Sequence, residues 1–354
     1  MRPVRAVQVV RLGKTVPEGI RGVQVVTLPT PMEPSVSLGP GDVLVQVKAA
    51  SVNFPDILMT AGQYQAKPPL PFVPGMEVSG IVLDVGPATT ASTSSKLRKG
   101  DKVMCLMGTG GFATRVVVRE AQCQRLPSTW SFEEGAASLV AYTTAYHGLV
   151  ERANVQPGET VLVGFAAVQI AKLLGATVIA TGSTDAKLDI VRRHAGADHV
   201  INYVRTPQFR DEVKRLSNGG GGVDVVYDPV GGDTTLESIR STTYGARIVL
   251  IGHAGGKHAQ LPATLILIKG LSIMGARAGE YVRRFPEHNA ARMERILGWA
   301  ESGRLRMHIS HRLPLARIVD AMQLLWDRQV VGKAVVTMDD EDNAHAPAHG
   351  RPRL

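Results

Sequence analysis

Residues 159–183 read "ETVLVGFAAVQIAKLLGATVIATGS", and this stretch decides the fold. A short run rich in Val and Leu leads into an apolar segment of helix-forming residues, and a second β-branched run follows. Gln169 and Lys172 interrupt the apolar segment, so a buried strand–helix–strand unit explains it better than a single helix in lipid. Only Gly164 stands where the unit turns from strand to helix.

The same alternation continues toward the C-terminus. Strand-like runs at 199–202, 223–228, 247–252 and 271–275 are separated by helix-like runs, which predicts a doubly wound parallel sheet with right-handed crossovers. A helix is predicted from Ser131 onward, because Ser131 and Glu134 have capping-box spacing. The first 130 residues are short strands between turn residues, which predicts an antiparallel barrel or sandwich. The polar tail 339–354 is expected to be disordered.

Composition limits the class of protein. The chain has 354 residues, 44% of them hydrophobic and 20% charged, as in ordinary soluble globular proteins. The net charge of +9 raises the question of an anionic partner, and residues 283–317 hold eight Arg and three Glu. Solvated helix faces are the simpler interpretation of that segment. Without an interleaved aromatic surface, nucleic acid is not expected as a partner.

The two cysteines, Cys105 and Cys123, are too few for a four-thiolate zinc site. They allow one disulfide, but buried free thiols in a reducing compartment are the favoured interpretation. With no signal-peptide pattern and no membrane span in the sequence, a cytoplasmic location is expected.

Ligands of such sheets bind beyond the carboxyl ends of the strands. At the end of the second strand Gly182 and Ser183 form the turn, and Lys187 lies one helical turn beyond. A hydroxyl and a cation suit a 2′-phosphate, which favours NADP over NAD. A capped helix with a solvent-facing Lys is the alternative. The next strand ends at Tyr203, and later strand ends carry glycines that let a flat ligand approach the backbone: Gly231 and Gly232 after Val230, and Gly252.

The segments "SVNFPDILMTAGQY", "PFVPGMEVSGIVLDVG", "AYTTAYHGLVERANVQPGETVLV", "GADHVINY", "VDVVYDPVGGD" and "VVGKAVVTM" appear in the order typical of one family. Over about residues 1–338 the chain resembles the quinone oxidoreductase (zeta-crystallin-like) branch of the medium-chain dehydrogenase/reductase superfamily. The resemblance implies a GroES-like β-rich catalytic domain (1–134), a Rossmann NADP-binding domain (135–280) and a C-terminal segment that completes the catalytic domain (281–338). It also implies NADPH, a small quinone or enone substrate, and a homodimer.

Matching positions carry the family's site residues onto this chain. Asn53, Asp56 and Tyr64 would lie on the substrate side, where Leu58 replaces a frequent Tyr, and Thr144 would lie near the nicotinamide. The cofactor residues implied are Gly164, Gly182, Ser183, Lys187, Tyr203, Val230, Gly252 and Lys333. Zinc is not expected, because the metal-dependent relatives place a Cys at the "SVNF" motif and use a four-Cys lobe, and both are absent here. His147 is expected to pack rather than to catalyse.

One departure from the family pattern concerns the cofactor site directly. Relatives place a loop resembling G-A-A-G-G-V-G between the 160–163 strand and its helix, and this chain is about seven residues short there. That loop presents backbone N–H groups to a pyrophosphate. Three explanations stand: a real deletion that impairs the site, a remodelled helix start in which residues 165–168 serve as loop, or residues missing from the sequence. Activity as a zinc-independent NADPH-dependent reductase is therefore weighed against a non-catalytic binding or scaffold role, and against enoyl-thioester reduction.

Overall fold

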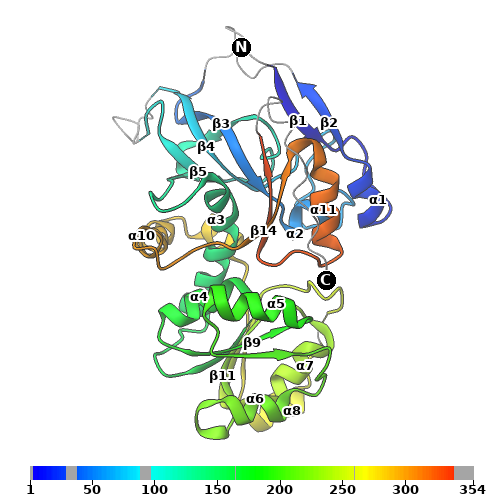
Figure 1. Cartoon of the computed structure of the whole chain (residues 1–354), viewed down its shortest axis with the longest axis vertical. Helices are drawn as coiled ribbons and strands as arrows, with labels where there is room; N and C mark the ends of the chain where they lie inside the picture. The colour runs from blue at the N-terminus through cyan, green and yellow to red at the C-terminus, as the bar shows by residue number, and fades with distance from the viewer. Residues whose placement is uncertain (1–2, 29–37, 88–96, 164, 259, 339–354) are drawn as a thin grey trace.

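The computed structural model describes residues 3–28, 38–87, 97–163, 165–258 and 260–338, and of Phe165 and Ala166 only the backbone. Two bodies lie one above the other in Figure 1, a β-rich body at the top and a body with a parallel sheet at the bottom. Helix α3 and the segment between α10 and β14 connect them. Within the described ranges, no helix is long and apolar enough to cross a membrane.

The lower body is built on a six-stranded sheet in the order β10-β9-β8-β11-β12-β13, with every neighbouring pair parallel. This is the doubly wound order in which the chain reverses direction across the sheet beside β8, so the predicted architecture is confirmed. The strands are β8 (Thr160–Val163), β9 (Thr177–Gly182), β10 (His199–Asn202), β11 (Val223–Asp228), β12 (Thr242–Leu250) and β13 (Ser272–Gly275).

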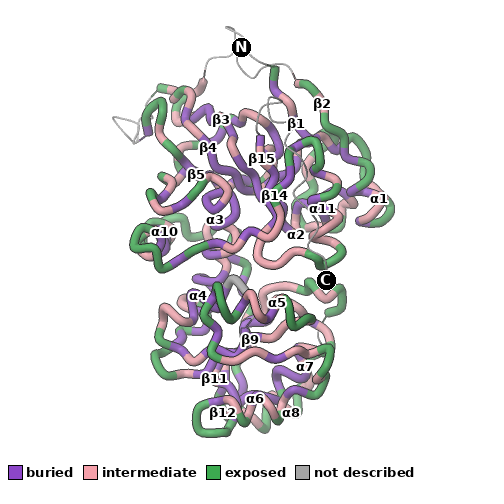
Figure 2. The backbone as a smooth tube through the Cα atoms, viewed as in Figure 1, coloured by how far each residue is buried: buried purple, intermediate pink, exposed green. Residues whose placement is uncertain are grey.

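Helices cover both faces of this sheet because successive strand residues point to opposite sides. Val161 and Val163 belong to the core shared with α3 and α4, whereas Leu162 belongs to the core under α6 and α7. Figure 2 shows buried segments, in purple, along β9 and β11. The helices are α4 (Phe165–Leu173), α5 (Asp185–Ile190) with its continuation η3 (Val191–Ala195), α6 (Arg210–Leu216), η4 (Asn218–Gly220), α7 (Gly232–Arg240) and α8 (Ala263–Lys269).

The upper body contains a seven-stranded sheet in the order β14-β15-β3-β4-β5-β7, with β6 also paired to β3. All pairs are antiparallel except β14–β15, and β15 pairs with β3, so the last strand of the chain lies in the sheet of the first domain. Its elements are β1 (Val4–Gln8), α1 (Val16–Arg21), β2 (Gln24–Leu28), β3 (Asp42–Ser51), α2 (Phe54–Met59), β4 (Glu77–Val85), β5 (Lys102–Leu106), β6 (Arg115–Arg119), η1 (Glu120–Gln122), β7 (Cys123–Arg125), β14 (Ile309–Pro314), η5 (Leu315–Arg317), α11 (Ile318–Trp326) and β15 (Lys333–Thr337).

Helix α3 (Phe132–Tyr146) joins the two bodies and crosses the predicted domain boundary at residue 134. The predicted capping box is confirmed: Glu134 N–H donates to Ser131 Oγ (3.2 Å) and Ser131 N–H donates to Glu134 Oε2 (3.1 Å). The helix runs on as η2 (His147–Arg152), where the buried His147 Nδ1 lies 2.5 Å from Glu151 Oε2. Helices α9 (Ala278–Arg284) and α10 (Glu287–Glu301) follow the lower sheet in sequence.

The joint between β8 and α4 differs from one expectation. Strand β8 ends at Val163 and α4 begins at Phe165, so of the three explanations of the short joint, the one in which residues 165–168 serve as loop is wrong. Ala167, Val168, Ile170 and Ala171 of this nine-residue helix are all fully buried, and unwinding the first turn would remove two of them from the core. Gly164 lies outside the described residues, as does the 339–354 tail.

Candidate active site

Four polar side chains meet where β3, β4 and β15 come together. Glu77 Oε1 accepts hydrogen bonds from the Asn53 amide (3.0 Å), from the Lys333 ammonium (2.7 Å) and from the Ser51 hydroxyl. Lys333 Nζ also donates to Asn53 Oδ1 (2.5 Å), and Asn53 Nδ2 to Ser51 Oγ (3.2 Å). Glu77 is fully buried, whereas the Lys333 side chain keeps 12% of its surface exposed. A buried carboxylate therefore fixes one ammonium group at the edge of the core.

The local sequence explains why Asn53 is held so firmly. Asn53 precedes α2 in extended conformation, and its N–H donates to Asp56 Oδ2 (2.8 Å) in the first turn of the helix. Asp56 Oδ1 accepts from the Gly75 N–H (3.2 Å), so this carboxyl joins α2 to the start of β4. Burial is the main cause that raises the pKa of Asp56 to about 7. Both oxygens of Asp56 face backbone amides, which supports a positioning role.

Sequence reasoning missed Ser51 and Glu77. Both lay inside motifs that were recognised, one at the end of β3 and the other at the start of β4, 26 residues apart. A Glu that opens a mostly apolar strand is a signal of a polar site, because an ionised side chain is rarely fully buried without partners.

Helix α3 reaches the same network. Val140 N–H donates to Glu77 Oε2 (2.8 Å), and Thr144 follows one turn later on the same face of the helix. The half-buried Thr144 therefore lies one helical turn beyond the point where α3 contacts the Glu77 carboxylate. Tyr64 is also half-buried and packs against the core of the upper body.

The carboxyl end of β9 carries the residues predicted to hold an adenosine phosphate. Tyr203 N–H donates to Gly182 O (3.1 Å), which brings the ends of β9 and β10 together. Thr184 caps α5 through the Lys187 N–H (3.3 Å), and so Ser183 is not used as the cap. A Cβ at Gly182 would lie 2.8 Å from the Leu188 side chain, so this glycine admits the packing of α5.

Two cations meet beside this turn. Lys187 Nζ donates to the backbone carbonyl of Arg328, and the pKa of Lys187 is lowered by burial and by the charge of Arg328. Arg328 has a φ of 58°, an uncommon conformation for a residue other than glycine. Its Nη2 donates to the carbonyls of Ala254 (3.3 Å) and Gly255 (3.2 Å). The positive charge of Arg328 therefore acts on Lys187, and no motif in the sequence marked Arg328.

The turns after β11 and β12 complete this edge of the sheet. The N–H groups of Val230 (2.8 Å) and Gly231 (3.0 Å) donate to the buried Asp228 Oδ1, which fixes the first turn. At Gly252 a Cβ would have no neighbour closer than Pro229 O, at 3.7 Å. This edge of the sheet therefore carries ordered turn amides and an open backbone at Gly252, with Lys187 and Arg328 nearby.

Comparison with known proteins agrees with this arrangement. A family model described as the alcohol dehydrogenase GroES-like domain matches residues 39–128, and one described as zinc-binding dehydrogenase matches residues 163–295. Quinone oxidoreductase-like protein 2 of Bos taurus is 39% identical over 308 residues, which cover 84% of this chain and 86% of that protein.

Two further relatives show how widely the fold is used. The synaptic vesicle membrane protein VAT-1 homolog of Homo sapiens is 31% identical over 326 residues, covering 86% of this chain and 80% of that protein. A solved mycobacterial structure complexed with NADPH has a TM-score of 0.82 at 29% identity, covering 94% of this chain and 99% of that one. The chain therefore belongs to the medium-chain dehydrogenase/reductase superfamily, in its quinone oxidoreductase-like branch.

Proposed function

We propose that this chain is an NADPH-dependent reductase of quinones and related α,β-unsaturated carbonyls. The observation that carries the proposal is the pair of cations, Lys187 and Arg328, at the carboxyl end of β9. A 2′-phosphate is the group of NADPH that such a pair recognises and that NADH lacks. Family membership supports the reaction class.

The remaining cofactor contacts follow from position. Ser183 and Tyr203 would flank the 2′-phosphate end, and Val230 and Gly252 would face the rest of the dinucleotide from the turns after β11 and β12. Gly164 is the single residue left at the pyrophosphate position, where the backbone amides at the start of α4 would be the donors.

On the substrate side, NADPH when bound supplies a hydride from its nicotinamide, and a proton from solvent completes the reduced product. The Lys333 ammonium, which is partly exposed at the edge of the core, would donate to the cofactor. Asn53 would orient that ammonium, because its amide already bonds Glu77 and Ser51. Thr144 and Tyr64 would border the space for the substrate carbonyl, and Asp56 would hold Asn53 in place.

Zinc independence is part of the proposal. Among the residues that the structure describes, no group of three or more His, Cys, Asp or Glu is arranged to hold a metal ion. Ser51 stands in the motif where metal-dependent relatives place a Cys. Turnover should accordingly persist after dialysis against a strong chelator, and metal analysis should find less than one zinc per ten chains.

Purified chain, NADPH and a panel of small quinones test the proposal directly. We expect NADPH oxidation that depends on the quinone, and weaker binding of NADH than of NADPH. Failure of both binding and turnover would refute it. Enoyl thioesters in competition kinetics distinguish the remaining substrate class: mutual inhibition with a higher kcat/KM for the thioester would reassign the substrate.

A second candidate function, non-catalytic binding on the same fold, is favoured by the one-residue joint between β8 and α4. A shortened joint presents fewer backbone donors to a pyrophosphate. Calorimetry separates the two candidates, because a micromolar Kd for NADPH contradicts a scaffold that has lost its cofactor.

A homodimer is proposed on the exposed face beside β13. Strand β13 is an edge of the parallel sheet, and Tyr244, Leu267 and Ile268 near it are 78%, 80% and 67% exposed. Large apolar side chains gathered at a sheet edge mark an interface. Light scattering after size exclusion should give about twice the mass of the chain, and Leu267→Asp should reduce it.

A cytoplasmic location is proposed from the free thiols of Cys105 and Cys123, whose sulfur atoms lie 3.5 Å apart.

A further inference from the structure

Gln169 is a buried polar side chain in the apolar helix α4 that the proposed reaction does not use. It is one of the two residues that interrupt this apolar segment in the sequence. The other, Lys172, pairs with Asp198 at 2.8 Å, and both of those side chains are 35% exposed. Gln169 keeps only 8% of its surface exposed. An amide buried to this extent costs free energy unless it is hydrogen-bonded, so its partners indicate its role.

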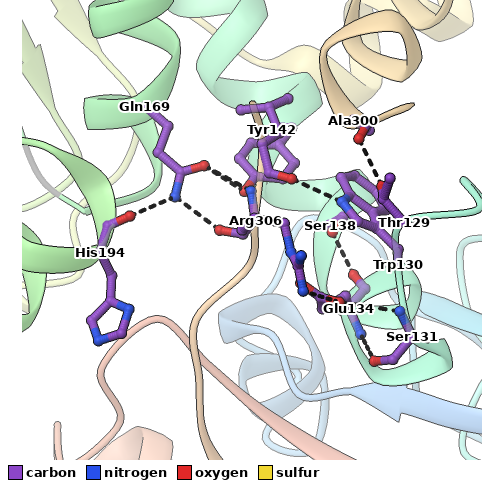
Figure 3. Close-up of polar contacts among 11 residues, drawn as sticks. Thr129, Trp130, Ser131, Glu134, Ser138, Tyr142, Gln169, His194, Ala300 and Arg306 are labelled. Atoms are coloured by element: carbon purple, nitrogen blue, oxygen red, sulfur yellow. Dashed lines mark hydrogen bonds and ion pairs between the residues drawn. The ribbon is translucent and has the colours of Figure 1, made fainter. Parts of the chain in front are cut away.

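All four hydrogen-bonding positions of the Gln169 amide are filled (Figure 3). The amide nitrogen donates to the backbone carbonyls of Arg306 (2.8 Å) and His194 (3.4 Å). The amide oxygen accepts from the Arg306 N–H (3.2 Å) and from the Tyr142 hydroxyl (3.0 Å). Both backbone polar groups of Arg306 are therefore bonded to α4, although Arg306 lies 137 residues further along the chain, in the segment between α10 and β14.

The segment around Arg306 is also held from α3. Trp130, just before this helix, donates from Nε1 to Leu305 O (2.9 Å). The Arg306 guanidinium donates to both oxygens of Glu134, at 2.7 and 3.2 Å, and Glu134 is the capping-box residue in the first turn of α3. The backbone and the side chain of Arg306 are thus bonded to two different helices, which fixes the segment where it passes between the two bodies of the molecule.

The same segment leads directly to the backbone of Lys333. The Lys333 N–H donates to His308 O (3.0 Å), and β14 and β15 then run on as a parallel pair. The approach is close, because a Cβ at Gly332 would clash with the carbonyl of His308. Arg306 and His308 are two residues apart, a span of at most about 7 Å of extended chain. The hold of α4 on Arg306 therefore reaches the residue that carries the active-site ammonium.

We propose that Gln169 is a positioning residue of the reductase, which sets where the Lys333 ammonium lies relative to the start of α4. The ammonium belongs to the upper body, whereas the α4 amides proposed to meet the pyrophosphate belong to the nucleotide-binding domain. Gln169 joins the two through the backbone of residues 306–308. Release of that backbone would move Lys333 relative to a cofactor held on α4. This role rests on the proposed function, since the position of Lys333 has a chemical consequence only when cofactor is bound.

Gln169→Met tests the proposal, because it keeps the length of the side chain and removes all four bonds. The kcat for quinone reduction, expressed per NADPH-binding site, should fall about tenfold to a hundredfold, the size of effect that a shift of about 1 Å in a positioned group produces. The KM for the quinone should stay within about a factor of two, because no contact with the substrate is lost. A purely structural role would lower the free energy of unfolding and leave kcat per site unchanged, and that result would overturn the inference.

Tyr142→Phe is the matched control, because it removes one bond to the same amide and leaves both bonds to Arg306. It should keep the wild-type kcat per site. A loss equal to that of Gln169→Met would overturn the inference, since general loosening around the amide would then explain both. If Gln169→Met does not fold, Gln169→Glu decides: it keeps both acceptors, loses both donors and should lower kcat per site about fivefold, whereas an unchanged value would overturn the inference.

Hydrogen exchange followed by mass spectrometry separates this inference from the proposed function. In Gln169→Met, amides of residues 304–309 and 331–335 should exchange about tenfold faster than in the wild type, and those of residues 78–82, which pair with β3, should not change. Absence of quinone-dependent NADPH oxidation by the wild type would refute the proposed function, and faster exchange at 331–335 would still support the hold of Gln169 on Lys333. Normal turnover by the wild type with unchanged exchange at 331–335 in the variant would overturn the inference and leave the function standing.

Discussion

The buried carboxyl of Asp56 should make the stability of the chain fall as the pH rises. Its pKa is raised from 3.8 to about 7, first because burial disfavours the charged form and further because Glu77 lies nearby. A folded-state pKa above the unfolded value means that the stabilisation is complete below about pH 4 and is lost as the pH rises through about 7. A difference of about three pKa units corresponds to about 4 kcal/mol, of which about 3 kcal/mol falls between pH 5 and pH 8.

Asp56→Asn removes this dependence because an amide does not ionise. The variant loses one of the two acceptors used by the Asn53 and Gly75 amides, at a cost of about 1–3 kcal/mol that does not vary with pH. The free energy of unfolding is therefore plotted against pH for both proteins, and the difference between the two slopes reports on the ionisation of Asp56. Urea unfolding at pH 5, 6, 7 and 8, followed by tryptophan fluorescence, measures it.

The matched control is Asp101→Asn. Arg98 N–H and Arg125 lower the pKa of the half-buried Asp101, so its contribution is present above pH 4 and is lost only as the pH falls through that lowered value. This variant should keep the wild-type slope between pH 5 and pH 8. Parallel stability profiles of Asp56→Asn and the wild type over the same range would refute the reasoning, because they would mean that Asp56 ionises in the folded chain as it does in the unfolded one.

Three further predictions concern single contacts. Lys187→Ala should raise the Kd for NADPH about tenfold or more and change that for NADH little, since a charge-assisted bond is worth about 1.5–3 kcal/mol; equal losses for both cofactors in a binding titration would contradict it. Glu77→Gln and Lys333→Met should each cost about 3–5 kcal/mol in urea unfolding and the double variant less than their sum, whereas additive losses would mean that the pair is not coupled. The bond to Cys123 and burial raise the pKa of the Cys105 thiol, so a thiol reagent at pH 8 should label it only after unfolding, and labelling of the folded chain would show that the thiol is accessible.

Local patterns in the sequence were sufficient to predict the architecture. The alternation of β-branched and helical runs predicted the parallel sheet, and the spacing of Ser131 and Glu134 predicted the start of α3 with its reciprocal bonds. These features depend on neighbours within four residues or on a repeated period, which one sequence displays directly.

Contacts between segments far apart in the chain could not be predicted from the sequence. Arg328 meets Lys187 across 141 residues, and Arg306 meets Glu134 across 172. Neither pair is marked by a repeat or by a fixed spacing in the sequence. The left-handed backbone conformation at position 328 could not be predicted either, because the residue there is Arg and not Gly or Asn, which favour that conformation. The short joint before α4 left three explanations open for a different reason: loop-length statistics allowed an unwound first turn, but the burial of Ala167 and Val168 holds that turn in the helix.

The joint after β8 yields a last prediction, which separates a damaged site from a remodelled one. Insertion of a seven-residue glycine-rich loop between Val163 and Gly164 restores the backbone donors that a pyrophosphate meets in relatives. If the shortened joint impairs the site, the insertion should tighten NADPH and NADH by a similar factor, about tenfold, because both cofactors carry the pyrophosphate. An insertion of seven serines controls for length alone.

The opposite outcome has an equally definite meaning. Weaker binding of both cofactors after the glycine-rich insertion would show that α4, starting at Phe165, is itself the binding element and has been displaced by the loop. In that case affinity in the native chain must come largely from Lys187 and Arg328 at the far end of the cofactor. The native preference for NADPH over NADH would then shrink in Lys187→Ala by the same factor by which NADPH binding weakens, since NADH lacks the 2′-phosphate proposed to bind that pair.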